Sequence, residues 1–331
     1  MRPDTTVTTF SDLKNDKHAH AAKVAAQLAK DAQPQDERVS GYFVQQRVQD
    51  ALRHVGNDTL ADLIQNCSRS SRCQSIWCAQ CRETAVASSH ALLCKRVAPL
   101  EEVYQALDGS TTIDRSDPAF NDYMNGELLH VSGYVGMFSL DSQAVSDGID
   151  LDRKRWKKIK GRRRSVEFWV TGTYELEVVN IRYLMQRHNP ESAKKKEQVS
   201  QLLAYSRQQG WIADGAEVGV LVHWHGVTNA TQTMLRDALK DAYYLSGEKP
   251  YNVDGSGLYV QKLHADKAFD DNMDKIAGYP LKSATRYKHS FIGSDTGDEL
   301  LTKDHLGALI TLYQEVQGRS WRCLKIDHTV K

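Results

Sequence analysis

The chain has 331 residues, of which 40% are hydrophobic and 26% are charged, with a net charge of +1. This is the composition of an ordinary globular protein with room for two domains. No run of about 18 apolar residues is present, which argues against a membrane partner. The first residues, MRPDTTVTTFSDLKND, hold no apolar signal segment, so we expect a cytoplasmic protein in a reducing compartment.

The N-terminal part is expected to be helical. Good helix formers and apolar residues at spacings of three and four predict helices over residues 16–35, 41–66 and 83–107. The segment DGSTTIDRSDPAFND makes residues 108–126 loop-like. We therefore expect a helical N-terminal region over residues 1–115.

Four of the six cysteines fall in one short segment, CSRSSRCQSIWCAQC. They are Cys67, Cys73, Cys78 and Cys81. In a reducing compartment such a density is more typical of metal ligands than of disulfides, and thiolates suit Zn²⁺. Four protein ligands leave no position for a substrate, so the expected role is structural. Buried thiols that pack as small apolar groups are the alternative, and Cys94 and Cys323 are interpreted as core residues.

The rest of the chain alternates strands and helices. Strands are predicted at 128–140, 165–179, 217–227 and 257–264, and helices at 230–245, 266–279 and 303–317. This order predicts an α+β domain over residues 116–300 with helices on one face of a sheet, and a helical insertion near 181–212. Residues 301–331 are expected to form a C-terminal helix and tail.

Basic residues gather in one run. Residues 151–200 hold 14 Lys and Arg against 6 Asp and Glu, and most of the excess lies in RKRWKKIKGRRR. A solvated helix face is one interpretation; a polyanion-binding face, for nucleic acid, is the other. The candidate DNA-binding residues are Arg153, Lys154, Arg155, Lys157, Lys158, Arg162, Arg163 and Arg164.

Two histidines follow an aliphatic run in VLVHWHGV. On a strand, residues two apart face the same side, so His223 and His225 could share one ion while Trp224 points into the packed side. His18 and His20 have the same spacing, but on a predicted helix they diverge.

A neighbouring strand is expected to supply a third ligand. The segment TYELEVV offers Glu175 and Glu177 on one face. Mixed imidazole and carboxylate ligands with open positions suit Mg²⁺ or Mn²⁺ acting on phosphate oxygens. An exposed sheet face with unrelated polar residues is the alternative.

A tyrosine downstream is a candidate nucleophile. Tyr279 and Lys282 form a Tyr-x-x-Lys arrangement, and a phenol needs a cation or ammonium nearby to act at neutral pH. Tyr287, followed by Lys288, is a second candidate.

The order of these parts resembles the rolling-circle replication initiators of small bacterial plasmids, in the HUH endonuclease superfamily. The likeness covers about residues 67–290 and is carried by CQSIWCAQCR, YELEVV, VLVHWHGV and GYPLK. Glu177 is the better match to the acidic ligand of the family, and Glu175 is the reserve. Some relatives carry an acidic residue one turn before the tyrosine, where this chain has Lys275 beside Asp274.

The resemblance implies a central antiparallel sheet and nicking of single-stranded or hairpin origin DNA. Tyr279 would attack the phosphate and leave a 3′-hydroxyl and a 5′-phosphotyrosine link, and a host helicase would be a further partner. A transposase or phage initiator of the same superfamily would use identical chemistry. A zinc-stabilised DNA-binding regulator without catalysis is the alternative from another class. A small-molecule metallohydrolase is disfavoured, since it leaves the basic run unexplained.

Overall fold

The computed structural model describes residues 41–109, 111–160, 167–186, 193–245, 258–278, 281, 285–288, 296–318 and 324–330. The expected helix over 16–35, with His18 and His20, lies outside these ranges. Among the described residues, no helix is both long and apolar enough to cross a membrane.

From residue 41 on, the described N-terminal part is helical, as expected. Its helices are α2 (Gly41–His54), α3 (Asp58–Gln65), α4 (Ala79–Asp108) and α5 (Pro118–Glu127). The single helix expected over 41–66 is two, because Gly56 takes a φ of +76° and the Asn57 side chain caps α3 by accepting from the Leu60 N–H. The expectation of a loop over 108–126 is wrong at α5, where Asp117 caps a helix that begins with Pro118.

Seven described strands form one sheet, which makes the fold α+β. They are β1 (Leu129–Phe138), β2 (Phe168–Asn180), β3 (Val218–Thr228), β4 (Leu258–Lys262), β5 (Arg286–Lys288), β6 (Thr296–Leu300) and β7 (Lys325–Val330). The order is β4-β1-β3-β2-β5-β6, and β7 also pairs with β2. The sheet is mixed rather than purely antiparallel, because β2 and β5 run parallel where Val179 faces Lys288.

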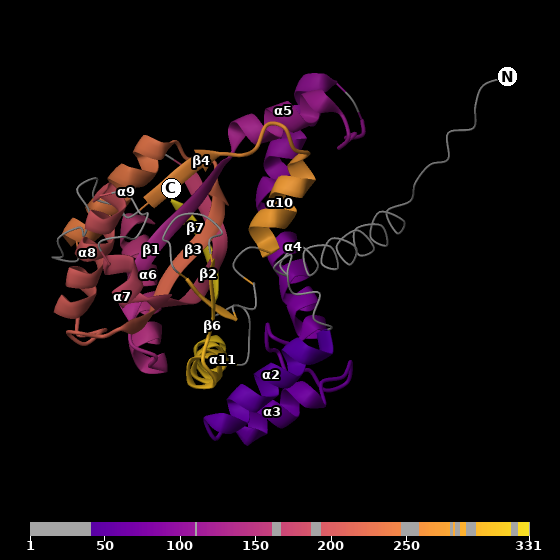
Figure 1. Ribbon diagram of the computed structural model, residues 1–331. Helices are drawn as coiled ribbons and strands as arrows, with labels where there is room; N and C mark the ends of the chain where they lie inside the picture. Colours follow the sequence, from indigo (N-terminus) through magenta and orange to yellow (C-terminus); the bar gives the residue numbers. More distant parts are fainter. Residues whose placement is uncertain are drawn as a thin grey trace.

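Helices cover both faces of the sheet, so the expectation of helices on one face is wrong (Figure 1). The other helices in the described ranges are α6 (Ser142–Lys160), α7 (Ile181–Met185), α8 (Ala193–Gln208), α9 (Gln232–Leu245), α10 (Phe269–Gly278) and α11 (Lys303–Gln317). On one face, Trp156 of α6 packs edge-on against Trp224 of β3, with ring centroids 5.9 Å apart. On the other, Ser89 of α4 lies 2.9 Å from the hydroxyl of Thr173 in β2. The central strands are therefore buried on both sides.

Near 181–212, the described residues form two helices, α7 and α8, as expected of this region. The Ser206 hydroxyl in α8 accepts a 2.8 Å hydrogen bond from the Met137 N–H in β1, so this region is tied to the sheet.

The C-terminal segment is part of the sheet rather than a tail. Strand β7 pairs with the first half of β2, from Phe168 to Thr173. Further along β2, past the residues that pair with β7, the Leu176 N–H donates a 2.9 Å hydrogen bond to the Tyr313 hydroxyl of α11. Helix α11 also packs closely on α2, since a Cβ at Gly307 would lie only 2.4 Å from the Ala51 carbonyl. Helix α11 thus joins the N-terminal helices to the sheet.

Candidate metal centres

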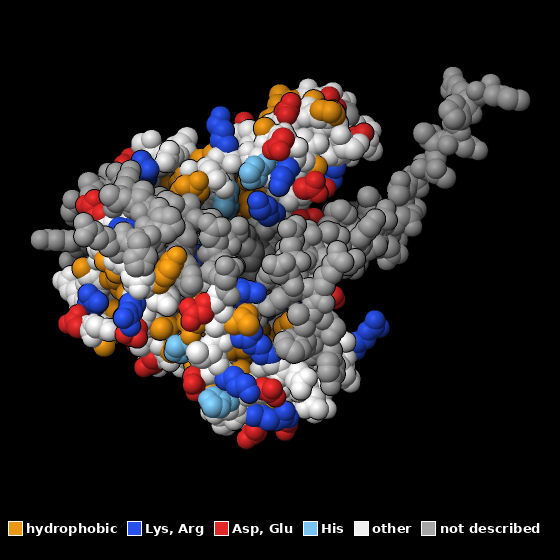
Figure 2. All heavy atoms as spheres, in the orientation of Figure 1, with side chains coloured by type: hydrophobic (Ala, Val, Ile, Leu, Met, Phe, Trp, Pro, Cys, Tyr) orange, Lys and Arg blue, Asp and Glu red, His pale blue; other side chains and the backbone are white. Residues whose placement is uncertain are grey.

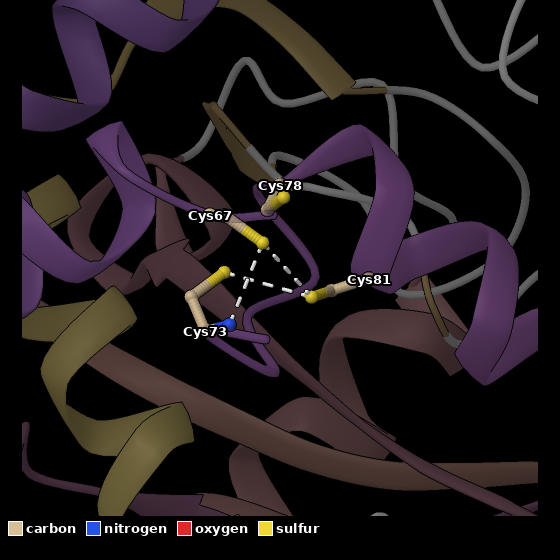
Figure 3. A group of neighbouring side chains, drawn as sticks. All are labelled: Cys67, Cys73, Cys78 and Cys81. Carbon is tan, nitrogen blue, oxygen red and sulfur yellow. Dashed lines mark hydrogen bonds between the residues drawn. The ribbon is translucent and has the colours of Figure 1, made fainter. Parts of the chain in front are cut away.

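The four clustered cysteines lie together in the loop between α3 and the start of α4. Their side chains point toward one another (Figure 3), and all four sulfur atoms lie within 4.8 Å of one another. The Cys81 sulfur is 3.6 Å from those of Cys67 and Cys73. Tetrahedral Zn²⁺ with Zn–S bonds of about 2.3 Å requires S···S separations of about 3.8 Å. The four residues thus fit a metal ion of this kind.

The four thiols of this cluster differ in their tendency to ionise: a hydrogen bond with Cys78, together with burial, raises the pKa of Cys73, and burial raises the pKa of Cys81. The Gln74 N–H donates to the Cys81 sulfur at 3.2 Å, and Gln74 reaches this position with a left-handed φ of +58°. The hydrogen bond from Cys73, against the opposing effect of burial, lowers the pKa of the Cys78 thiol to about 5. A thiolate is the form that binds metal.

The cluster is tied to the rest of the molecule through α11. The Gln317 side chain donates a 2.9 Å hydrogen bond to the Gln74 carbonyl. Trp77 packs edge-on against Tyr313, with ring centroids 5.2 Å apart. The same Tyr313 accepts from the backbone of β2, so the cysteine loop, α11 and the sheet share one core.

A second group of ligands lies on the face of the sheet opposite α6. Glu175, His223 and His225 each offer an oxygen or nitrogen, and these atoms lie within 4.8 Å of one another. The register explains why: Glu175 of β2 is directly opposite His223 of β3, and His225 is two residues along the same strand. All three are buried. As predicted, both imidazoles share a face, and Trp224 points into the opposite core.

Contacts from β1 orient the two imidazoles. His225 shares a 2.7 Å hydrogen bond between its Nδ1 and the Ser132 hydroxyl, while its Nε2 lies 3.1 Å from Glu175 Oε2. Tyr134 stacks on His223 with ring centroids 5.9 Å apart, and His130 stacks on His225 at 5.7 Å. A hydrogen bond on the far ring nitrogen fixes the orientation of a ligating histidine.

Burial favours the neutral form of two imidazoles on this face, those of His130 and His223. Burial, with His225 and Lys275 nearby, lowers the pKa of His130 to about 3. Burial and the Lys288 ammonium lower the pKa of His223, and together they outweigh the opposing effect of Glu175 and Glu177. Neutral imidazole is the form that binds a metal.

Glu177 occupies a different position from Glu175. Its Oε2 accepts a 2.8 Å hydrogen bond from His223 Nε2 and forms an ion pair with the buried Lys288 of β5. Burial alone would raise the pKa of Glu177, but Lys288 and His223 outweigh it and hold that pKa well below its ordinary value. The structure therefore groups Glu175, rather than Glu177, with both imidazoles, whereas the family match had favoured Glu177.

The two residues of the Tyr-x-x-Lys arrangement, Tyr279 and Lys282, lie outside the described residues. Helix α10 ends at Gly278, the residue before Tyr279. Met273 and Ile276 of α10 share a core with Val227, which lies on the histidine face of β3. On the same helix, burial together with Asp270 and Asp271 raises the pKa of Asp274 to about 7. The helix that leads to Tyr279 thus packs on the face that carries the ligands.

The reserve nucleophile, Tyr287, faces away from these ligands. It is 3% exposed, and its hydroxyl lies 2.5 Å from His305 Nδ1. Its neighbour on β5, Lys288, projects to Glu177, and successive residues of a strand point to opposite faces. Tyr287 is therefore a packing residue in this structure.

The basic run lies on α6, which covers the face opposite the histidines. Arg155 is fully buried and donates to the Tyr205 hydroxyl, so the expectation that it binds DNA is wrong. Arg153 is partly buried and pairs with Asp150 at 3.4 Å. Among the side chains of the run that the structure describes, Lys154, Lys157 and Lys158 are exposed. Arg162, Arg163 and Arg164 lie outside the described residues.

Basic and acidic side chains are intermixed over the described part of the face seen in Figure 2. No single-sign field covers that part.

Sequence reasoning did not connect the residues that support the histidine group with that group. Ser132 and Tyr134 come from β1, and Lys288 comes from a three-residue strand. Lys288 is 111 positions from Glu177 along the chain, and no local motif connects the two. Only a pairing register between strands could have revealed these contacts.

Comparisons with known proteins identify no relative. No family model matches the chain, and neither the curated proteins nor the solved structures contain a match to it. The resemblance to the replication initiators therefore stays a prediction.

Proposed function

We propose that the protein nicks and rejoins a specific strand of DNA at a replication origin, through a covalent 5′-phosphotyrosine intermediate, and so starts rolling-circle replication. The observation that carries this proposal is the buried group of Glu175, His223 and His225 on adjacent strands. A helix that packs on the same face leads directly to Tyr279.

The ligand group favours a divalent cation with affinity for both nitrogen and oxygen. Two imidazoles and one carboxylate suit Mn²⁺ better than Mg²⁺, which prefers oxygen ligands alone. When bound there, the cation would supply Lewis-acid polarisation of the scissile phosphate. Ser132 keeps the His225 ring in orientation through its Nδ1.

The proposed chemical step belongs to Tyr279. Its phenolic oxygen attacks the phosphorus and loses its proton to solvent, while the bond from phosphorus to the 3′-oxygen breaks and that oxygen takes up a proton. The phosphotyrosyl bond retains the phosphodiester energy, so a second attack by the 3′-hydroxyl reseals the strand. Lys282 is proposed to stabilise charge on the phenolic oxygen.

The structural Zn²⁺ proposed for the four cysteines would hold the loop that joins α3 to α4. Single-stranded or hairpin origin DNA is the proposed substrate, with a host helicase as a further partner, and the cytoplasm is the proposed location. The exposed lysines of α6 are proposed as auxiliary phosphate contacts.

A covalent-adduct assay tests this function. The full chain is mixed with Mn²⁺ and single-stranded oligonucleotides that tile the DNA flanking its gene, each labelled at the 3′ end. Because the link is to the 5′ side of the released segment, a 3′ label follows the protein in a denaturing gel. We expect a labelled adduct with the native chain and with Tyr287→Phe, and none with Tyr279→Phe.

The same assay distinguishes the alternatives. A zinc-stabilised DNA-binding regulator would retain DNA without forming an adduct under any metal condition. An adduct that persists in Tyr279→Phe would assign the nucleophile to another residue. A transposase or phage initiator would also form the adduct, and the DNA sequence that supports nicking would then identify the element served.

A further inference from the structure

Two glutamates of β2 face the same side of the sheet and compete for one place beside the histidines. The Oε2 atom of Glu175 lies 3.4 Å from His223 Nε2 and 3.1 Å from His225 Nε2. The Oε2 atom of Glu177 lies 2.8 Å from His223 Nε2 and pairs with Lys288. Both carboxylates are therefore within reach of His223. A further contact is needed to determine which of the two binds a cation.

Lys288 distinguishes the two carboxylates, because it forms an ion pair with Glu177. It comes from β5, which pairs in parallel with β2 where Lys288 is opposite Val179, and Val179 lies on the same face as Glu177. The Lys288 side chain is only 6% exposed. A buried ammonium requires a carboxylate partner, and removal of one member of such a pair leaves an uncompensated buried charge. Glu177 is the partner here.

We propose that Lys288 is a positioning residue that holds Glu177 in an ion pair, so that Glu175 is the one carboxylate that binds the cation with His223 and His225. The inference rests on the proposed metal site. It adds a determinant of metal affinity contributed by a strand outside the His and Glu motifs. Loss of the Lys288 charge would release a second anionic ligand beside the same two imidazoles.

Mn²⁺ titration of the purified full chain tests this, with free Mn²⁺ followed by electron paramagnetic resonance. We expect Glu175→Gln to weaken binding by about tenfold or more, and Glu177→Gln to change it by less than about threefold. Lys288→Met is expected to tighten binding by about tenfold, because Glu177 then joins the ligands. The double variant Glu175→Gln/Lys288→Met should recover affinity to within about threefold of the native chain.

Matched controls keep the test independent of folding. Lys288→Arg retains the ion pair and should bind Mn²⁺ as the native chain does. Glu177→Gln/Lys288→Met removes both charges, leaves no unpaired buried ion, and should also match the native affinity. Native affinity in Lys288→Met, with no recovery in the double variant that also carries Glu175→Gln, overturns the proposal.

Failure of the proposed function would look different. The expected Mn²⁺ pattern without any covalent DNA adduct would remove the nicking function and leave the role of Lys288 in place. If the adduct forms but Glu175→Gln and Glu177→Gln weaken Mn²⁺ binding equally, the nicking function stands and the proposed role of Lys288 is wrong.

Discussion

The two candidate metal centres are held together in opposite ways. The four clustered cysteines belong to one short stretch of chain, the loop after α3 and the first turn of α4, whereas Glu175, His223 and His225 come from two paired strands. The first group lies mostly in a loop, and four converging thiolates repel one another unless a cation neutralises them. The second group is positioned by sheet register, with or without an ion. Metal should therefore govern folding at the first site and chemistry at the second.

The largest expected effect follows metal removal at the cysteine cluster. Structural zinc sites bind with apparent free energies of about 10–16 kcal/mol, and that energy is folding energy where the site does not preform. We expect Cys81→Ser, or a high-affinity chelator, to remove several kcal/mol from the free energy of unfolding. Amide protection should be lost first in the loop and at the start of α4. Hydrogen exchange followed by mass spectrometry measures both effects.

Elemental analysis provides the control for that comparison. The native chain is expected to carry about one zinc per molecule, as a single four-thiolate site requires, and Cys94→Ser should keep it. A chain purified without zinc, with an unchanged melting temperature after chelation, would mean that the four thiols are packing residues.

The second prediction is that the histidines affect metal binding more than they affect stability. His223→Ala and His225→Ala should each weaken Mn²⁺ binding by about a hundredfold and abolish the DNA adduct. The cost to unfolding should be about 1–3 kcal/mol, from a small cavity and lost hydrogen bonds. Titration calorimetry measures Mn²⁺ affinity, scanning calorimetry measures stability, and the adduct assay measures nicking. A loss of stability as large as that of Cys81→Ser would erase the contrast between the sites.

A third prediction addresses the sheet that positions the histidines. Gly172 of β2 is directly opposite Gly226 of β3, and a Cβ at Gly172 would lie 2.1 Å from the His225 carbonyl oxygen. Because that neighbour is backbone, Gly172→Ala must push the strands apart, at an expected cost of about 1–3 kcal/mol. Mn²⁺ affinity should fall with it, since Glu175 and His223 lie on those strands.

The matched control is Gly126→Ala in α5. No atom lies within 4 Å of a Cβ placed at Gly126, so this change should be neutral or stabilise by up to about 1 kcal/mol. Chemical denaturation of both variants measures the difference. Equal stabilities would show that β2 and β3 tolerate a wider separation than the register implies.

The sequence predicted the parts of these sites that depend on local pattern. Alternation marked β2 and β3, and i, i+2 spacing on a strand placed both imidazoles on one face. The choice between Glu175 and Glu177 was beyond local pattern, because it depends on the register with β3 and on an ammonium 111 residues away. The same limit applies to β7, whose role as a neighbour of β2 is set by pairing rather than by composition.

Charge density failed as a guide to exposure on α6. A basic run indicates a helix with many cations, but it does not say which side of that helix meets the sheet. Arg155 and Trp156 lie on the buried side, where Trp156 contacts Trp224 of β3. The lysines at positions 154, 157 and 158 lie on the exposed side. Helical periodicity within the run, with Trp156 as the marker of the inner face, carries the signal that residue counting missed.

The smallest expected effect comes from that exposed side of α6, on the far face of the sheet from the histidines. Replacement of Lys154, Lys157 and Lys158 by Gln should change stability by less than about 0.5 kcal/mol, because exposed charges contribute little. If single-stranded DNA passes over α6, each lost phosphate contact should reduce the slope of log K against log salt by about 0.7, or about 2 for all three. Affinity at several salt concentrations measures this slope, and Arg155→Met serves as the contrast, since it should destabilise the fold.

DNA that reached both α6 and the histidines would have to pass around an edge of the sheet. An unchanged slope with normal adduct formation would therefore confine the DNA to the histidine face.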